Sequence, residues 1–398
     1  MPVKAVVSLL HRLYKWEYIW LCLIVLVTLI LHFVIVANPA SLILDEQYYI
    51  KEARNIIENQ RIVFQEHPPL AKLFIVAGIN TFGDNTLGWR FSSIILGTGC
   101  ILLFYFICRR LNLSNRTASI ATFLLGLENM TFVQSSIAML DVFFLFFMFV
   151  AFLLYLSRRY VSSGIAVGLG ALAKLNGVLA MPVLIIHWFF SRIPRSRWFA
   201  LAVALSVVSF VVLMPLFDYF LVLDFSHVHS PLDRIKTMLN LSGSITFGNS
   251  THESMSRPWE WLISYKVMPF WWTPHYISAV SPSIWALIIP TFAYMLYKAI
   301  KRDDAGLFGV AWFASTYLLW IPASLITNRL SYVFYFYPTI GAICLGLGMG
   351  LSQLIDIFQG RKSGKLKWTA LGIVVVVLLV HFVSFMILYP LFPIRLYK

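Results

Sequence analysis

The sequence predicts an all-α, polytopic integral membrane protein, and three observations support this prediction. Sixty per cent of the 398 residues are hydrophobic, only 12% are charged, and the mean hydropathy is +0.80. A soluble domain has about 25% charged residues. The apolar residues are also gathered in blocks of about 17–25, the length that crosses a bilayer as a helix. We therefore expect one transmembrane domain over residues 1–398.

Eleven spanning helices are expected along the chain. Residues 163–190 are too many for one crossing and are interrupted by the polar stretch Lys174–Gly177, so we interpret them as two short helices. One long tilted helix is the alternative, and it would reverse the topology after it. A cleavable signal peptide is the alternative for the first block, but its apolar run is longer than usual for one. The other spans are expected at 17–37, 90–108, 116–134, 139–156, 198–217, 283–300, 306–324, 331–352 and 368–388.

The charge distribution gives the orientation of these helices. If the N-terminus lies in the cytoplasm, the inner loops hold eighteen of the 31 basic residues and four of the 17 acidic ones. The inner side then carries the whole net charge of +14, as the positive-inside rule requires. The basic composition therefore reports membrane topology, and we expect no nucleic-acid partner.

Two long outer loops, at 38–89 and 218–282, hold most of the candidate functional residues. No nucleotide-binding motif follows a predicted strand, and the four cysteines lie within predicted spans, so they indicate neither a disulfide framework nor a zinc motif. His227, His229, His252 and His275 match no metal-ligand spacing, and we expect no metal and no cofactor. Trp259 and Trp261 in the second loop either anchor the interface or shape a binding groove.

The first outer loop contains two adjacent carboxylates at the start of an amphipathic helix, Asp45 and Glu46. Asp45 is either the N-cap of this helix, with Leu44 and Tyr49 as a hydrophobic staple, or a catalytic group. Neighbouring side chains on a helix point about 100° apart, so the two carboxylates cannot face each other across one glycosidic bond. A catalytic Asp45 would therefore act alone, as a general base, which suffices when the leaving group is a phosphate.

Two basic residues are candidates to hold such a phosphate. Arg329 lies at the outer mouth of a predicted span, where a charge is costly unless it is paired. Lys174 lies in the break between two short helices, and broken helices tend to line cavities. The alternative for both is a side chain that merely reaches the interface. Asp141 either faces the same site or caps the fourth span.

Six segments together resemble the protein O-mannosyltransferase family, which transfers mannose from a polyprenyl-phosphate donor. They occur in family order through most of the chain, which makes the resemblance far more specific than any one motif. The segments are LDE (44–46), EHPPLAK (66–72), VQSSIAMLD (133–141), GLGALAKLNG (168–177), HESMSRPWEW (252–261) and RLSYVFYFYP (329–338).

The resemblance implies a GT-C glycosyltransferase fold with eleven helices, an inverting reaction at the outer face and no metal. It also implies that mannose passes to a Ser or Thr hydroxyl of a protein, with membrane lipid as a partner and either a homo- or a heterodimer as the assembly. The family roles fall on Asp45 as the catalytic base, on Glu46 for the acceptor and on Arg329 for the donor phosphate, while His67, Lys72, Asp141 and His252 fall on further motif positions. We also expect His252 and Trp259 to contact the acceptor, and Lys174 and Lys72 to contact the donor phosphate.

The sequence departs from the family pattern at two places. Ser136 stands where the family usually has an arginine, and the loop at 218–282 is too short for the β-trefoil domain of eukaryotic members, which indicates a bacterial or archaeal type. Three alternatives stay open: a related transferase acting on a lipid or glycan, such as an aminoarabinose or arabinose transferase, a non-catalytic assembly subunit, and a transporter. A transporter should show repeated halves with matching broken helices, and only one broken region is visible.

Overall fold

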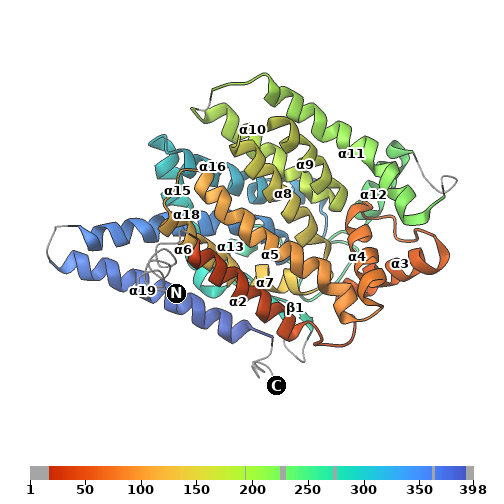
Figure 1. The fold of residues 1–398 in the computed structure, drawn as a ribbon, viewed down its shortest axis with the longest axis horizontal. Helices are drawn as coiled ribbons and strands as arrows, with labels where there is room; N and C mark the ends of the chain where they lie inside the picture. The colour runs from red at the N-terminus through yellow and green to blue at the C-terminus, as the bar shows by residue number, and fades with distance from the viewer. Residues whose placement is uncertain (1–17, 193, 225–229, 272–275, 361–363, 391–398) are drawn as a thin grey trace, which may run out of the picture.

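The computed structural model describes residues 18–192, 194–224, 230–271, 276–360 and 364–390, and nearly all of its regular structure is helical (Figure 1). Five continuous helical segments are long and apolar enough to cross a membrane. They are α5 (Thr86–Arg110), α11 (Trp198–Val222), α16 to α17 (Asp304–Thr327), α18 with the short turn before it (Val333–Gln359), and α19 (Lys365–Leu388).

Shorter helices account for the remaining predicted spans. A helical segment coincides with each of the eleven expected blocks, while the number that cross the membrane stays a prediction. These segments are α2 (Ile19–Ile35), α6 (Asn115–Gly126), α7 (Asn129–Ser136), α8 (Leu140–Leu156), α9 (Tyr160–Ala173), η1 (Leu175–Leu179), α10 (Ala180–Phe190), α14 (Pro282–Trp285) and α15 (Ile288–Ile300).

The expectation of one continuous helix over 116–134 is wrong. Helix α6 ends at Gly126, and a separate helix α7 begins at Asn129 and is bent by 113° from α8. The buried Glu128 carboxylate causes the new start, since it accepts hydrogen bonds from the backbone N–H groups of Thr131 and Ser281. A side-chain cap of this kind satisfies the free donors at the start of a helix.

The break predicted at Lys174 is confirmed, and two glycines determine its shape. Helix α9 ends at Ala173, Lys174 is extended, and η1 folds back so that Gly177 packs on Gly170. A Cβ atom at Gly177 would lie 2.1 Å from the Gly170 carbonyl carbon, so only glycine permits this approach. The fold-back leaves Lys174 at the tip of a turn instead of inside a helix.

The segments predicted in the outer loops gather at one end of the bundle. They comprise α3 (Glu46–Asn59), α4 (Leu70–Phe82), α12 (Pro231–Ser244), α13 (Glu260–Ile263) and an antiparallel pair, β1 (Met268–Trp271) and β2 (Tyr276–Ser278). In Figure 1, α3, α4 and α12 lie together at the right of the molecule. The predicted amphipathic helix after Asp45 is confirmed as α3, whose Tyr49, Ala53 and Ile56 are buried.

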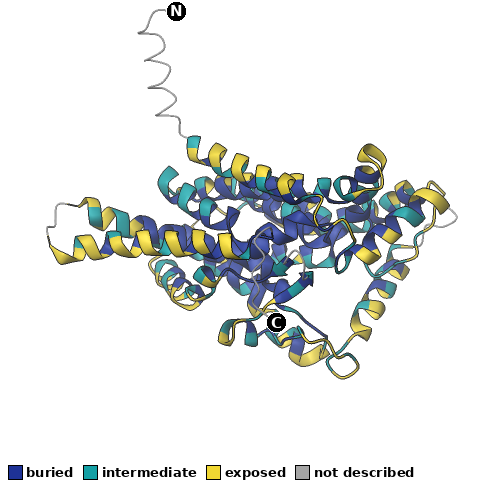
Figure 2. Ribbon diagram, turned by 90° about the horizontal axis from the view of Figure 1, so that it is seen from below, coloured by how far each residue is buried: buried dark blue, intermediate teal, exposed yellow. Residues whose placement is uncertain are grey.

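Burial separates a packed interior from an apolar exterior. Helix α9 packs between α8 and α11, and α18 packs against α6 and α16. Large apolar side chains are nevertheless exposed along α2, α11 and α19, and Figure 2 shows exposed residues on the outer helices. Such a surface is unfavourable in water and is expected in lipid. The chain is therefore a multi-pass membrane protein.

Candidate active site

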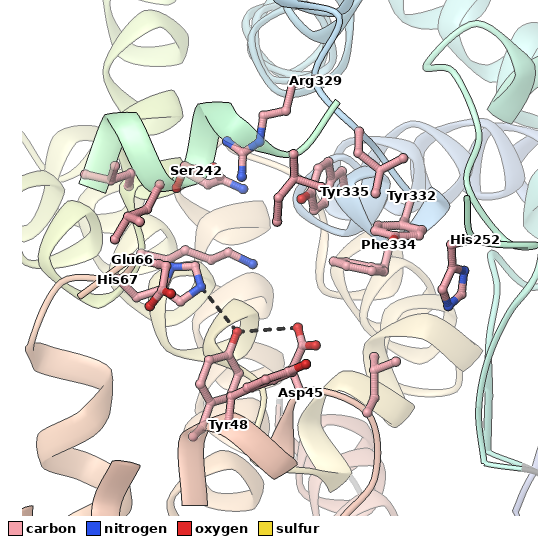
Figure 3. Close-up of a pocket in the computed structure, with 18 of the residues that line it drawn as sticks. Asp45, Tyr48, Glu66, His67, Ser242, His252, Arg329, Tyr332, Phe334 and Tyr335 are labelled. Atoms are coloured by element: carbon pink, nitrogen blue, oxygen red, sulfur yellow. Dashed lines mark hydrogen bonds between the residues drawn. The ribbon is translucent and has the colours of Figure 1, made fainter. Parts of the chain in front are cut away.

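A cavity of about 500 Å³ lies where the outer segments meet the broken helix (Figure 3). It is enclosed by the start of α3, the segment before α4, the turn after α9, the end of α12 and two loop segments at 245–252 and 329–335. Its lining includes Leu44, Asp45, Gln47, Tyr48, Tyr49, Glu66, His67, Lys174, Asn176, Ser242, His252, Met268, Trp320, Arg329, Tyr332, Phe334 and Tyr335.

Asp45 stands at the N-cap position of α3, yet its side chain makes no capping hydrogen bond. Its carboxylate instead accepts a long hydrogen bond of 3.5 Å from the Tyr49 hydroxyl and points into the cavity (Figure 3). The residue before it, Leu44, has a φ of 44°, an uncommon left-handed conformation for a residue other than glycine. The capping interpretation of Asp45 is therefore not supported by the geometry.

The surroundings of Asp45 make it a stronger base than an ordinary aspartate. Burial raises the pKa of its carboxyl, Lys174 opposes that rise, Asp141 adds to it, and the Tyr49 hydrogen bond opposes it. A carboxylate with a raised pKa has a higher affinity for a proton while remaining able to ionise. This is the electrostatic setting that a general base requires.

Lys174 reaches the cavity as one half of a buried ion pair. Its Nζ atom lies 2.7 and 2.9 Å from the two carboxylate oxygens of Asp141, which sits in the first turn of α8. The N-cap position of α8 belongs to Met139, so Asp141 does not cap this helix. Because Asp141 compensates the ammonium charge, Lys174 is not a free cation at the cavity wall.

His67 faces the same cavity from the segment before α4. Its Nε2 atom lies 3.5 Å from the Tyr49 hydroxyl, which thus stands between His67 and Asp45 (Figure 3). Burial and the nearby cations Lys174, Lys72 and Arg329 lower the pKa of His67 well below its usual value. The imidazole is therefore neutral at pH 7 and adds no positive charge to the cavity.

Arg329 is brought to the cavity by the pairing of two loop segments. The backbone of 245–247 pairs with that of 328–330, through Leu330 N–H to the Ile245 carbonyl (3.1 Å) and Phe247 N–H to the Asn328 carbonyl (3.0 Å). Within the part of the chain that the structure describes, the Arg329 guanidinium has no carboxylate or hydrogen-bond partner. Five free N–H donors thus face a cavity, an arrangement suited to an anion.

His252 lines the same cavity as Asp45, with its ring against Tyr332 at a centroid distance of 5.4 Å. His227, His229 and His275 lie outside the described residues. Among the residues that are described, no three His, Cys, Asp or Glu side chains are grouped closely enough to hold a metal.

Four predicted site residues do not line the cavity: Asp141, which pairs with Lys174 as described above, and Glu46, Lys72 and Trp259. Glu46 is fully buried and accepts two hydrogen bonds of 2.9 Å from Arg90, so the expected contact with the acceptor is replaced by a structural role. Lys72 is buried against Glu52 at 2.7 Å and against the Phe64 carbonyl, away from the cavity lining. Trp259 stands at the start of α13, outside the lining.

Sequence reasoning missed several contributors to the site. The Tyr49 hydroxyl was expected only as part of an apolar contact, and Glu66 and Ser242 were not singled out. Arg234 was missed as well: it is buried and donates hydrogen bonds to the backbone carbonyls of Gln65 and His67, which fixes the segment that carries His67. In the sequence, Arg234 could have been recognised as a polar residue on an amphipathic helix.

Comparison with known proteins places this architecture in a family. The model of the dolichyl-phosphate-mannose-protein mannosyltransferase family matches residues 22–230, more than half of the chain. The chain belongs to this family. Among curated relatives, the polyprenol-phosphate-mannose–protein mannosyltransferase of Mycolicibacterium smegmatis is 35% identical over 116 residues, which cover 28% of this chain and 22% of the relative. The Mycobacterium tuberculosis protein of the same name is 33% identical over 150 residues, covering 36% and 29%. These matches span less than a third of the relatives' length.

Solved structures extend the similarity over nearly the whole fold of this mannosyltransferase-family chain. The Saccharomyces cerevisiae protein O-mannosyltransferase Pmt1–Pmt2 complex bound to the sugar donor has a TM-score of 0.75 at 12% identity, covering 94% of this chain and 90% of that chain. ArnT from Cupriavidus metallidurans bound to undecaprenyl phosphate has a TM-score of 0.64 at 17% identity, covering 94% and 77%. The fold is therefore the GT-C fold of membrane glycosyltransferases.

Proposed function

We propose that this chain is an inverting glycosyltransferase that moves mannose from a polyprenyl-phosphate-mannose donor to a Ser or Thr hydroxyl of a protein. One observation carries the proposal: the carboxylate of Asp45, which does not cap its helix, and the guanidinium of Arg329, which has no partner among the described residues, face the same cavity. A base and an anion-binding group are the two parts that this transfer needs. The names of the relatives and the donor-bound yeast structure support the same donor class.

The reaction follows from the placement of the base. Asp45 accepts the proton of the acceptor hydroxyl, and the oxygen attacks the anomeric carbon of mannose from the face opposite the phosphate. The new carbon–oxygen bond forms as the bond to the phosphate oxygen breaks, and its electron pair leaves with the polyprenyl phosphate. Attack from the opposite face inverts the anomeric configuration. A general base contributes about 10²–10⁴-fold to such a step.

The leaving group needs stabilisation because it departs as a phosphate with added negative charge. Arg329 supplies charge-assisted hydrogen bonds there, and within the described part of the chain it has no carboxylate partner to displace. Lys174 acts mainly through its field, since Asp141 already holds it, and that field favours the ionised form of Asp45. No step requires a metal or another cofactor, and none is proposed.

The cavity is proposed to open on the extracytoplasmic side, with the N-terminus in the cytoplasm. Helix α9 places Lys174 at its end and Arg158 and Arg159 just before its start, about 21 Å apart for 14 residues. The positive-inside rule assigns the end of α9 next to Arg158 and Arg159 to the cytoplasmic side. The cavity, at the other end of α9, is therefore assigned to the extracytoplasmic side.

The proposed partners are the lipid-linked donor, a protein acceptor and the surrounding membrane lipid. The yeast neighbour is a complex of two chains, and a homo- or heterodimer of this chain stays a prediction. A related transferase that acts on a lipid or glycan acceptor is the second candidate, because the fold also matches ArnT, so the fold alone does not select a protein acceptor.

The test is sugar transfer by the purified full chain in liposomes. Polyprenyl-phosphate-mannose is supplied with either a Ser/Thr-rich peptide or a lipid acceptor, and parallel reactions contain polyprenyl-phosphate-arabinose or aminoarabinose. Transfer of mannose to the peptide, with the anomeric configuration inverted in the NMR spectrum of the product, is expected. Transfer of another sugar, or transfer to the lipid only, would replace the proposal by the second candidate. Retention of configuration would contradict the single-base mechanism.

A further inference from the structure

A second cavity, lined by three arginines, lies at the opposite end of α9 from the candidate active site. Its volume is about 570 Å³, and it forms between the α8–α9 turn and the α10–α11 connection. In Figure 1 the α10–α11 connection is at the top of the molecule, and α11 runs from it towards α12. The lining includes Arg158, Arg159, Arg195, Val161, Ser162 and Trp198.

The positive charge in this cavity is not compensated. Among the described residues, no carboxylate pairs with Arg158, Arg159 or Arg195, and no Asp or Glu side chain lines the cavity. Arg195 stacks over Trp188 with its guanidinium carbon 5.5 Å from the ring centroid. Stacking uses the face of the guanidinium and leaves its N–H edge available to an anion.

Backbone donors add to the same positive region. The N-cap position of α9 is Arg159, whose side chain makes no capping hydrogen bond, and Val161 and Ser162 in the first turn of this helix line the cavity. The N-terminus of a helix carries about half a positive charge. Together with three guanidinium groups this favours a ligand with a phosphate or similar anion.

An apolar cavity of about 370 Å³ adjoins the first and shares Arg195 and Ser196 with it. Its other walls include Ile185, Trp188, Phe189 and Val203 from α10 and α11. Trp198 and Phe189 are each more than half exposed beside these cavities, as aromatic side chains at a membrane interface often are. A positively charged cavity next to an apolar one matches an anionic amphiphile better than a soluble anion.

We propose that an anionic phospholipid binds here, with its phosphodiester on the three arginines and one acyl chain in the apolar cavity. The site lies at the cytoplasmic headgroup level if the proposed topology holds, where anionic lipids and basic residues attract each other. It is separate from the reaction described above, because the length of α9 lies between the two cavities. Lipid binding and sugar transfer can therefore be measured independently.

The test compares two lipids and two charge-matched variants. Delipidated full-length protein in detergent is titrated with palmitoyl-oleoyl phosphatidylglycerol or the corresponding phosphatidylcholine, and bound lipid is counted by native mass spectrometry. One variant combines Arg158→Gln, Arg159→Gln and Arg195→Gln. The control combines substitutions of three basic residues outside the cavity, which removes the same charge: Arg110→Gln, Lys301→Gln and Arg302→Gln.

We expect the wild type to retain phosphatidylglycerol in preference to phosphatidylcholine. Each arginine near such a headgroup contributes roughly fivefold, so removal of all three should lower this retention by roughly 100-fold. The control variant should keep it, and inorganic phosphate should not displace the lipid. Equal retention of the two lipids, an equal loss in both variants, or displacement by phosphate alone would overturn the proposal. A thermal melt establishes that each variant is folded.

Discussion

Replacement of Glu46 by glutamine separates a structural role from a role in acceptor binding. Glu46 and Arg90 have no exposed side-chain surface and share two hydrogen bonds of 2.9 Å. Arg90 also donates to the carbonyls of Val36 and Pro39 at 3.0 Å, and Glu46 accepts from the Ala138 N–H at 2.9 Å. The pair thus holds the chain between α2 and α3, and the start of α8, in one arrangement around Asp45.

The expected loss of stability in Glu46→Gln arises because the charge of Arg90 stays buried without a counter-charge. Removal of one partner from a buried ion pair costs about 3–5 kcal/mol. With the average unfolding entropy of globular proteins, that loss lowers the melting temperature of a chain of this length by roughly 4–6 °C. The exposed pair between Arg54 and Asp84 is the matched control, since Asp84→Asn should cost less than about 1 kcal/mol.

The assay measures the thermal melt and the acceptor KM of the Glu46→Gln and Asp84→Asn variants side by side. The account predicts a lowered melting temperature for Glu46→Gln, with kcat reduced because Asp45 is displaced. An unchanged melting temperature together with a raised acceptor KM would refute this reasoning and return Glu46 to the acceptor.

Three further predictions concern the cavity itself. Arg329→Gln should lower kcat/KM for the donor by roughly 10- to 150-fold, because a hydrogen bond to a charged group contributes about 1.5–3 kcal/mol. The melting temperature measured without donor should stay unchanged. Asp45 must be ionised to act as the base and burial raises its pKa, so activity should fall as the pH falls through that raised pKa. Tyr49→Phe removes a hydrogen bond that favours the ionised form of Asp45, so the acidic limb of the pH–rate profile should move to higher pH. A shift to lower pH would contradict the assignment. Gly177→Ala should destabilise the protein by about 1–3 kcal/mol and impair transfer. Gly372→Ala should do neither, because no atom lies within 4 Å of the new methyl group. Equal melting temperatures of the two variants would contradict the packing argument.

The parts of the fold that follow from local pattern were predictable from the sequence. Long apolar blocks gave the positions of α5, α11 and α19, and the polar stretch at Lys174 gave the break after α9. The separate start of α7 was not predictable in the same way, because the Glu128 carboxylate that caps it is also held by the backbone N–H of Ser281, which is distant in sequence. Such long-range partners leave no periodic signal.

Only part of the candidate site was predictable, namely the motif residues whose side chains line the cavity in the structure. Asp45, His67, Lys174, His252 and Arg329 line one cavity, although they come from segments up to 284 residues apart in sequence.

Glu46 was predicted to contact the acceptor because its neighbour in sequence is Asp45, but adjacent helical residues point in different directions, and its side chain is buried against Arg90. Its partner Arg90 is 44 residues away, and the sequence offered no indication that the two side chains meet.

The most direct test of the central claim is mannose transfer to peptide by Asp45→Asn beside wild type and Asp84→Asn in the same liposomes. The account predicts that Asp45→Asn, with an unchanged melt, loses about 10²–10⁴-fold in kcat while Asp84→Asn keeps wild-type turnover. Equal turnover by all three proteins would contradict the assignment of Asp45 as the base.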